Sequence, residues 1–150
     1  MPADKKLKVV FADPPFGAEA KGEAVTESPN LGILYIIGYA RERLPQVEFH
    51  YLEPFLSVQQ HLKKVAEIKP DVYALSFTTP RRELSFETIK KVKALGLSML
   101  MVAGGAHPTI DPQDVLKNTP VTVCIRGEGE ETTTELLQKI LQKQPITDVA

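Results

Sequence analysis

The sequence predicts an α/β domain in which helices cover both faces of a five-stranded parallel sheet. First, five short β-prone apolar runs alternate with helix-like segments. Second, several of these runs are apolar at successive positions, which is typical of strands that are buried on both faces. Third, 150 residues with 43% hydrophobic and 25% charged residues suffice for one globular domain with its own core. The predicted strands are Leu7–Ala12, Val47–Leu52, Asp71–Phe77, Ser98–Ala103 and Val121–Arg126.

The segments between the strands have helical character. In the last of them, Leu137, Ile140 and Leu141 share one helix face. Strands that alternate with helices imply right-handed crossovers, and five strands favour the flavodoxin-like order 2-1-3-4-5 in three layers. The predicted helices are Leu31–Leu44, Val58–Ile68, Leu84–Leu95, a short turn near Pro112–Lys117, and Glu130–Lys143.

In a sheet of this order the ligand site lies at the carboxyl ends of the strands, where the strand order reverses. The loops after Ala12 and Phe77 are expected to flank a cleft, with the loop after Ala103 alongside. The latter begins with Gly104 and Gly105, a pair that suggests positive φ angles or a close approach of another group. We therefore predict a ligand site there. The connection from Asp13 to Asn30 is long for such a fold and is expected to take part.

Several functional classes are disfavoured by the sequence. A net charge of −1 gives no excess of positive charge of the kind that binds nucleic acid. The longest apolar stretch, Leu31–Ala40, is far too short to span a membrane. The first loop, Asp13–Gly17, lacks the glycine fingerprint of dinucleotide-binding proteins, and no phosphate-binding P-loop is found. The third strand ends in Ser76 and Phe77, without the aspartate of a receiver domain.

One cysteine, Cys124, excludes an internal disulfide and any iron–sulfur cluster held by several cysteines of this chain. Together with an N-terminus that runs directly into a strand-like segment, it predicts a cytoplasmic location.

Four strand-end and helix-start segments occur in a distinctive order. They are Ser28–Tyr35, Ser76–Pro80, Gly104–Thr109 and Arg126–Glu130. Together they closely resemble the N-terminal cobalamin (B12)-binding domain of B12-dependent radical SAM enzymes. The resemblance runs from about Leu7 to Leu141.

The resemblance implies a domain that holds cobalamin against the carboxyl ends of its strands, with the dimethylbenzimidazole tail beside the sheet. In relatives of this fold a serine after strand three and a glycine pair after strand four line the pocket of the tail, and these match Ser76, Gly104 and Gly105. No catalytic residue and no metal ligand is assigned. The predicted cofactor contacts are Pro15, Leu31, Gly32, Ser76, Thr78, Thr79, Gly104, Gly105, Ala106, His107, Pro108, Gly127 and Glu128.

Simpler roles stay open for some of these residues. The hydroxyls after strand three can satisfy loop backbone groups. His107 can contact the nucleotide tail or its loop, ligate cobalt, or simply lie at the surface or cap a turn. Glu128 can accept from a ribose hydroxyl, and Leu31 and Gly32 can belong to a buried helix.

The chain departs from the pattern of cobalamin-dependent mutases and methyltransferases, which carry Asp-x-His-x-x-Gly after strand one. Asp13 and Gly17 are present, but Pro15 stands at the histidine position and the spacing is one residue shorter. The resemblance therefore implies base-off cobalamin without a histidine below the cobalt.

The resemblance further implies that residues 1–144 form the cobalamin-binding domain and that 145–150 are a linker or a truncated connection to a missing domain. That domain, in cis or in trans, would carry the [4Fe–4S] cluster and S-adenosylmethionine and would catalyse methyl transfer or related radical chemistry. With one cysteine, this chain is not expected to be catalytic alone. The alternatives are a stand-alone corrinoid carrier protein and a flavodoxin-like interaction domain without a cofactor.

Overall fold

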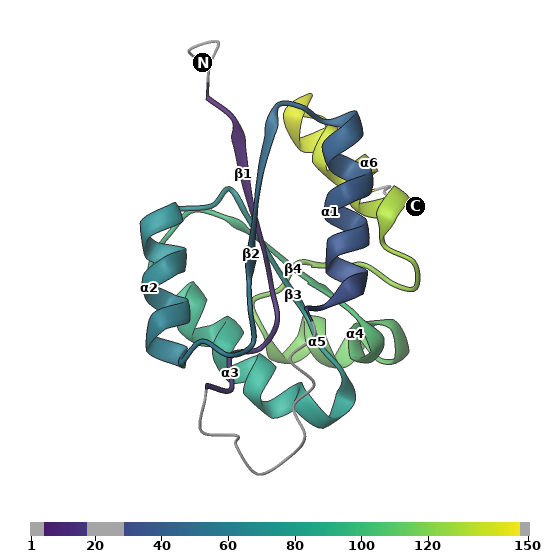
Figure 1. The fold of residues 1–150 in the computed structure, drawn as a ribbon. Coiled ribbons are helices and arrows are strands. Elements are labelled where there is room, and N and C mark those ends of the chain that lie inside the picture. Colours follow the sequence, from purple (N-terminus) through teal and green to yellow (C-terminus); the bar gives the residue numbers. More distant parts are fainter. Residues whose placement is uncertain (1–4, 18–28, 148–150) are drawn as a thin grey trace.

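The computed structural model describes residues 5–17 and 29–147 and contains a five-stranded sheet between two layers of helices (Figure 1). The strand order is β2-β1-β3-β4-β5 and every pair is parallel, which confirms the predicted topology. The strands are β1 (Leu7–Ala12), β2 (Val47–Leu52), β3 (Val72–Ser76), β4 (Leu100–Gly104) and β5 (Val123–Cys124).

The helices lie where the sequence places them, with two additions. They are α1 (Leu31–Arg43), α2 (Val58–Ile68), the 3-10 turn η1 (Thr79–Arg81), α3 (Arg82–Lys93), α4 (Ala106–Ile110), α5 (Pro112–Asn118) and α6 (Glu130–Leu141). Helices α1 and α6 pack side by side on one face of the sheet, and α2 and α3 cover the other (Figure 1). Among the described residues no helix is long and apolar enough to cross a membrane.

The prediction of a loop over Gly104–Thr109 was wrong in part, because α4 begins at Ala106. Pro108 does not prevent this helix, since a proline in the first turn loses no helical hydrogen bond. The strand predicted over Val121–Arg126 is likewise shorter. Only Val123 and Cys124 pair as a strand at the edge of the sheet, although Ile125 still donates to Ala103 across the ladder (2.8 Å).

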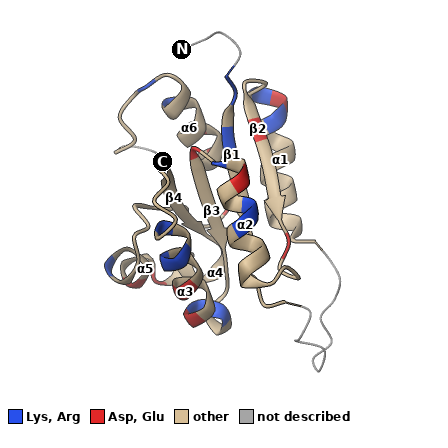
Figure 2. Ribbon diagram, turned by 90° about the vertical axis from the view of Figure 1, so that its left-hand side faces the viewer, with Lys and Arg blue, Asp and Glu red and all other residues tan. Residues whose placement is uncertain are grey.

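Alternation along the strands sends neighbouring side chains to opposite layers. On β1, Val9 and Phe11 join the core under α1 and α6, whereas Val10 and Ala12 join the core under α2 and α3. Along α2 and α3, Lys and Arg are interspersed with Asp and Glu (Figure 2). The two helix layers thus cover both faces of the sheet with separate apolar cores.

Candidate functional site

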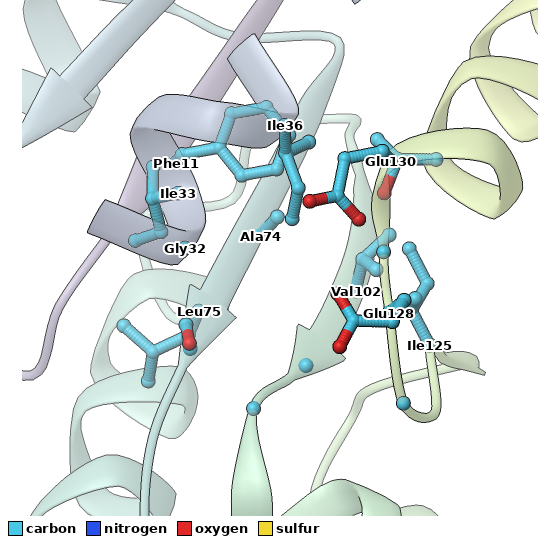
Figure 3. Close-up of a pocket in the computed structure, with 16 residues that line it drawn as sticks. Phe11, Gly32, Ile33, Ile36, Ala74, Leu75, Val102, Ile125, Glu128 and Glu130 are labelled. Carbon is cyan, nitrogen blue, oxygen red and sulfur yellow. The ribbon is translucent and has the colours of Figure 1, made fainter. Parts of the chain in front are cut away.

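A cavity of about 150 Å³ lies between α1 and α6, against the carboxyl-terminal halves of the central strands (Figure 3). Its walls are mainly apolar. Phe11 comes from β1, Val102 from β4 and Ile125 follows β5. Ile33 and Ile36 of α1 close it from above the sheet. Such a site favours a largely apolar group.

Small residues on two neighbouring strands create this space. Residues two apart on a strand point to the same face, so Ala74 and Ser76 of β3 lie on the α1 side, as do Val102 and Gly104 of β4. Ser76 and Gly104 are paired across the ladder. On this face of the sheet the side chains are larger nearer the amino ends of the strands. The alanine, serine and glycine at the carboxyl ends occupy less volume and leave a hollow.

The two glycines after β4 have different roles. Gly105 has φ = +95°, and a Cβ built on it would lie 2.8 Å from both the nitrogen and the oxygen of Phe77. Only glycine fits this close approach of two backbones. Gly104 is not restricted in this way, because the nearest atom to its Cβ would be the oxygen of Ile125, at 3.9 Å. Gly104 therefore keeps space open at the cavity, whereas Gly105 is required by the fold.

One side chain links the loops after β4 and β5. The Thr109 hydroxyl donates to the oxygen of Gly105 (2.8 Å) and accepts from the backbone nitrogen of Gly127 (2.9 Å). Gly127, with φ = +69°, also lines the cavity. The two loops are thus held together at the cavity rim.

Acidic side chains lie on the side of the cavity formed by the start of α6. The carboxylates of Glu128 and Glu130 extend toward the space between this segment and the central strands (Figure 3). Gly129 separates them, and a Cβ on it would lie 2.7 Å from Cδ1 of Ile36. The beginning of α6 therefore sits close against α1. Carboxylate oxygens at this position can accept hydrogen bonds from hydroxyl or amide groups of a ligand.

The structure brings about half of the predicted contacts together. Gly32, Ser76, Gly104, Gly105, Gly127 and Glu128 line the cavity. Leu31 lies next to it and is 59% exposed at the start of α1. Thr78 and Ala106 are exposed at the carboxyl edge, and Pro108 is buried within α4. Pro15 lines a separate hollow beside the β2–α2 loop. The assignment of these residues to a cofactor stays a prediction.

His107 is engaged on both sides by protein groups. Its Nδ1 lies 3.1 Å from the Thr79 hydroxyl, and its Nε2 lies 3.1 Å from Oδ2 of Asp114. The ring is 5% exposed and stacks on Phe77. Asp114 also pairs with Arg82, and this guanidinium holds the pKa of the Asp114 carboxyl well below its usual range. Through these hydrogen bonds His107, in α4, connects η1 to α5, which is a structural role.

A second polar cluster follows β1. Tyr51 and the Asn30 side chain both donate to the carboxylate of Asp13, the latter at 2.8 Å. Asn30 also caps α1 by accepting from the nitrogen of Ile33 (3.2 Å). Burial raises the pKa of Asp13 above its ordinary value despite these donors. The cluster anchors the start of α1, which carries one wall of the cavity. The middle of the long predicted loop, residues 18–28, lies outside the described residues.

Sequence reasoning missed much of the cavity wall. The missed residues are Phe11, Ile33, Ile36, Ala74, Leu75, Val102, Ile125, Gly129, Glu130 and Thr133. Most of them look like ordinary core positions in the sequence, and nothing in their spacing indicates that they border a space. In the described part of the chain no group of three or more His, Cys, Asp or Glu side chains is placed to hold a metal ion.

A doubly wound parallel sheet with a cavity at the carboxyl ends of its strands defines a ligand-binding domain of the flavodoxin-like class. Residues 20–137 match the family model described as the B12 binding domain, and the chain belongs to this family. The match confirms the resemblance drawn from the strand-end segments.

Two relatives have similar sequences over most of this chain. An anaerobic magnesium-protoporphyrin IX monomethyl ester cyclase of Cereibacter sphaeroides is 30% identical over 139 residues, 88% of this chain and 22% of the cyclase. An uncharacterized methyltransferase of Pyrococcus horikoshii is 26% identical over 137 residues, 91% of this chain and 30% of that protein. The chain thus spans less than a third of the length of these relatives.

Solved structures share the fold. The cobalamin-dependent S-adenosylmethionine radical enzyme OxsB, with aqua-cobalamin and S-adenosylmethionine bound, superposes with a TM-score of 0.81 at 18% identity over 97% of this chain and 20% of the enzyme. The radical S-adenosylmethionine methyltransferase TsrM from Kitasatospora setae gives 0.74 at 15% identity, covering 95% of this chain and 27% of that chain. A cobalamin-binding protein from Desulfitobacterium hafniense gives 0.65 at 18% identity, covering 91% of this chain and 59% of that chain.

Proposed function

We propose that this domain binds cobalamin in the base-off form, with the nucleotide base in the cavity between α1 and α6, and presents it to a radical SAM domain. The observation that carries the proposal is the cavity itself. Its space comes from Ala74, Ser76 and Gly104 on adjacent strands, at the edge where ligands of this fold class bind.

The residues present fit the base of the nucleotide tail. A flat heterocycle needs apolar walls, which Phe11, Val102 and Ile125 supply. It also needs a polar partner for a ring nitrogen, and the Ser76 hydroxyl on the cavity wall can donate to one. The volume of about 150 Å³ suits a single base and is too small for a corrin ring, so the ring would rest outside the cavity.

The histidines support binding without a protein ligand below the cobalt. The chain has three. His50 hydrogen-bonds to Glu48 at 2.6 Å, and His61 is fully buried against Tyr73. His107 uses both ring nitrogens within the protein. Pro15 stands at the position of the histidine in the Asp-x-His-x-x-Gly pattern of classical cobalamin-binding mutases and methyltransferases.

The partner domain follows from what this chain lacks. When bound, cobalamin supplies a cobalt-held methyl group or a site for related radical chemistry. A radical SAM reaction also needs a [4Fe–4S] cluster on several cysteines, and this sequence has one cysteine. The cluster and S-adenosylmethionine would therefore lie on a radical SAM domain, joined to this domain in cis or bound to it in trans. Relatives more than three times as long as this chain are consistent with the first arrangement.

The test is retention of hydroxocobalamin by the purified chain after removal of free ligand, followed by its visible spectrum. We expect retention with a base-off spectrum. Absence of retained cobalamin, or a base-on spectrum, would overturn the proposal. The first result would favour an interaction domain without a cofactor.

Two matched variants locate the site. Gly104→Val places three carbon atoms at the cavity where the fold leaves room for a Cβ, and it should abolish retention. Gly38→Val is the control, because Gly38 lies on α1 away from the cavity with no atom near its Cβ. It should retain cobalamin like the wild type. Full retention by Gly104→Val would show that the base does not enter this cavity.

A further inference from the structure

Thr133 borders the cavity with a buried hydroxyl that has no hydrogen-bond partner among the described residues. The residue lies in the first turns of α6 and is 2% exposed. Two buried helical threonines elsewhere in the chain donate to the carbonyl four residues earlier. Thr134 does so to Glu130 (2.7 Å) and Thr88 to Leu84 (2.7 Å). Thr133 makes no such bond, although its backbone nitrogen donates to Gly129.

A buried hydroxyl without a hydrogen-bond partner destabilises the folded protein. Valine has nearly the same shape and would avoid this cost. A threonine at such a position, in the wall of a cavity, is explained if a ligand atom pairs with the hydroxyl when the cavity is filled.

The other residues that line the cavity indicate which kind of ligand atom can pair with Thr133. The strand side of the cavity offers a second hydroxyl, Ser76, between apolar residues such as Phe11 and Val102. Thr133 belongs to a different element, so the two hydroxyls come from two separate walls, β3 and α6. A purely hydrocarbon occupant would leave both without a partner. An aromatic base with a free ring nitrogen offers an acceptor to one of them. Ser76 is half-buried and can bond to water instead, whereas the buried Thr133 hydroxyl has no other partner among the described residues.

We propose that Thr133 hydrogen-bonds to a ring nitrogen of the base that fills the cavity, and that the domain thereby selects corrinoids by their lower base. This inference rests on the proposed function. It favours nitrogen heterocycles of the benzimidazole or purine class over phenolic bases, which have no ring nitrogen. Threonine has two accessible χ1 rotamers in a helix, so the hydroxyl can turn to meet the base.

The experiment compares cobamides that share one corrin but carry dimethylbenzimidazole, adenine or p-cresol as the lower base. Thr133→Val should weaken binding of the two nitrogen bases about tenfold, the effect of one lost hydrogen bond, and leave the p-cresol form unchanged. Thr133→Ser keeps the hydroxyl and should bind like the wild type. Thr134→Val is the matched control, because that neighbouring hydroxyl is paired within the helix and does not line the cavity.

Thermal unfolding of the ligand-free chain gives a second readout. Thr133→Val should raise the melting temperature, because it removes an unpaired buried hydroxyl. Thr134→Val should lower it, because it removes a hydrogen bond. If Thr133 had only a structural role, Thr133→Val would not raise the melting temperature and weaken binding at the same time.

The outcomes separate the two proposals. The selection by Thr133 is overturned if Thr133→Val binds both nitrogen bases like the wild type, weakens all three cobamides equally, or lowers the melting temperature of the free chain. The proposed function fails instead if the wild type binds cobinamide, which has no base, as tightly as cobalamin, or binds no corrinoid.

Discussion

Lowering the pH is expected to destabilise this domain through one buried imidazole, that of His61. The side chain is fully buried between α2 and β3, where Nε2 lies 2.9 Å from the Tyr73 hydroxyl and Nδ1 has no described partner. Burial disfavours the charged ring and lowers the pKa of His61 from 6.5 to about 4. Below pH 6.5 the unfolded chain therefore takes up a proton that the folded chain does not.

The direction and magnitude of the change in unfolding free energy with pH follow from this difference in pKa. The contribution is fully present above pH 6.5, and it is lost as the pH falls toward 4, where the folded ring also becomes protonated. Over that window the loss amounts to about 3 kcal/mol, a large part of the stability of a small domain. Asp13 acts in the opposite direction, because its raised pKa makes protonation favour the fold. The net loss is therefore smaller than the His61 contribution alone.

Urea unfolding followed by circular dichroism at several pH values between about 7 and about 4.5 measures this effect. His61→Gln cannot take up a proton in this range and isolates the contribution of the imidazole. We expect the stability of the wild type to fall more steeply with pH than that of the variant. Parallel pH profiles for the two proteins would refute the reasoning.

Three further predictions concern other positions. Gly105→Ala should lower the free energy of unfolding by about 3 kcal/mol, because its Cβ would meet the Phe77 backbone at positive φ; an unchanged urea midpoint would contradict this. Tyr51→Phe should raise the pKa of Asp13 further by removing a donor, as followed by carboxyl NMR; a lower pKa would show that the hydroxyl does not stabilise the carboxylate. Burial raises the pKa of Cys124 from 9.0 to about 11, so alkylation by iodoacetamide at pH 8 should be about 100-fold slower than for an unperturbed thiol; comparable rates would place the thiol in solvent.

The architecture could be predicted because its signals are local and repeated. The bounds of β1, β2 and α2 agree with the sequence interpretation residue for residue, and α2 begins directly after the capping residue Ser57. The short helix α4 could not be predicted in the same way. Gly105 and Pro108 suggest a turn, and only the tertiary bond from the nitrogen of His107 to the oxygen of Phe77 (3.1 Å) shows how the chain folds back.

Most of the glycines that line the cavity could be predicted from the sequence, whereas most of the lining residues on the helices could not. Gly104 and Gly127 stand out because a glycine weakens a strand end unless the space beside its backbone is needed. Thr133 does not stand out in the sequence, because it sits in a run of three threonines within a helix. That its hydroxyl lacks a hydrogen-bond partner can be seen only in the structure. His107 was conspicuous in sequence for its chemistry, but hydrogen bonds to Thr79 and Asp114 use both of its nitrogens.

The bridge made by Thr109 has a consequence for how tightly a ligand can be held. Glycine-rich segments lose much conformational freedom when they become ordered, and a ligand that must order them binds more weakly. Here two hydrogen bonds within the protein join the Thr109 hydroxyl to Gly105 and to Gly127. This part of the rim is preorganised, so little entropy is lost there on binding and the contacts inside the cavity determine the affinity. Thr109→Val would change no side chain that lines the cavity and would loosen the rim at Gly105 and Gly127, which tests how much the preorganised rim contributes to affinity.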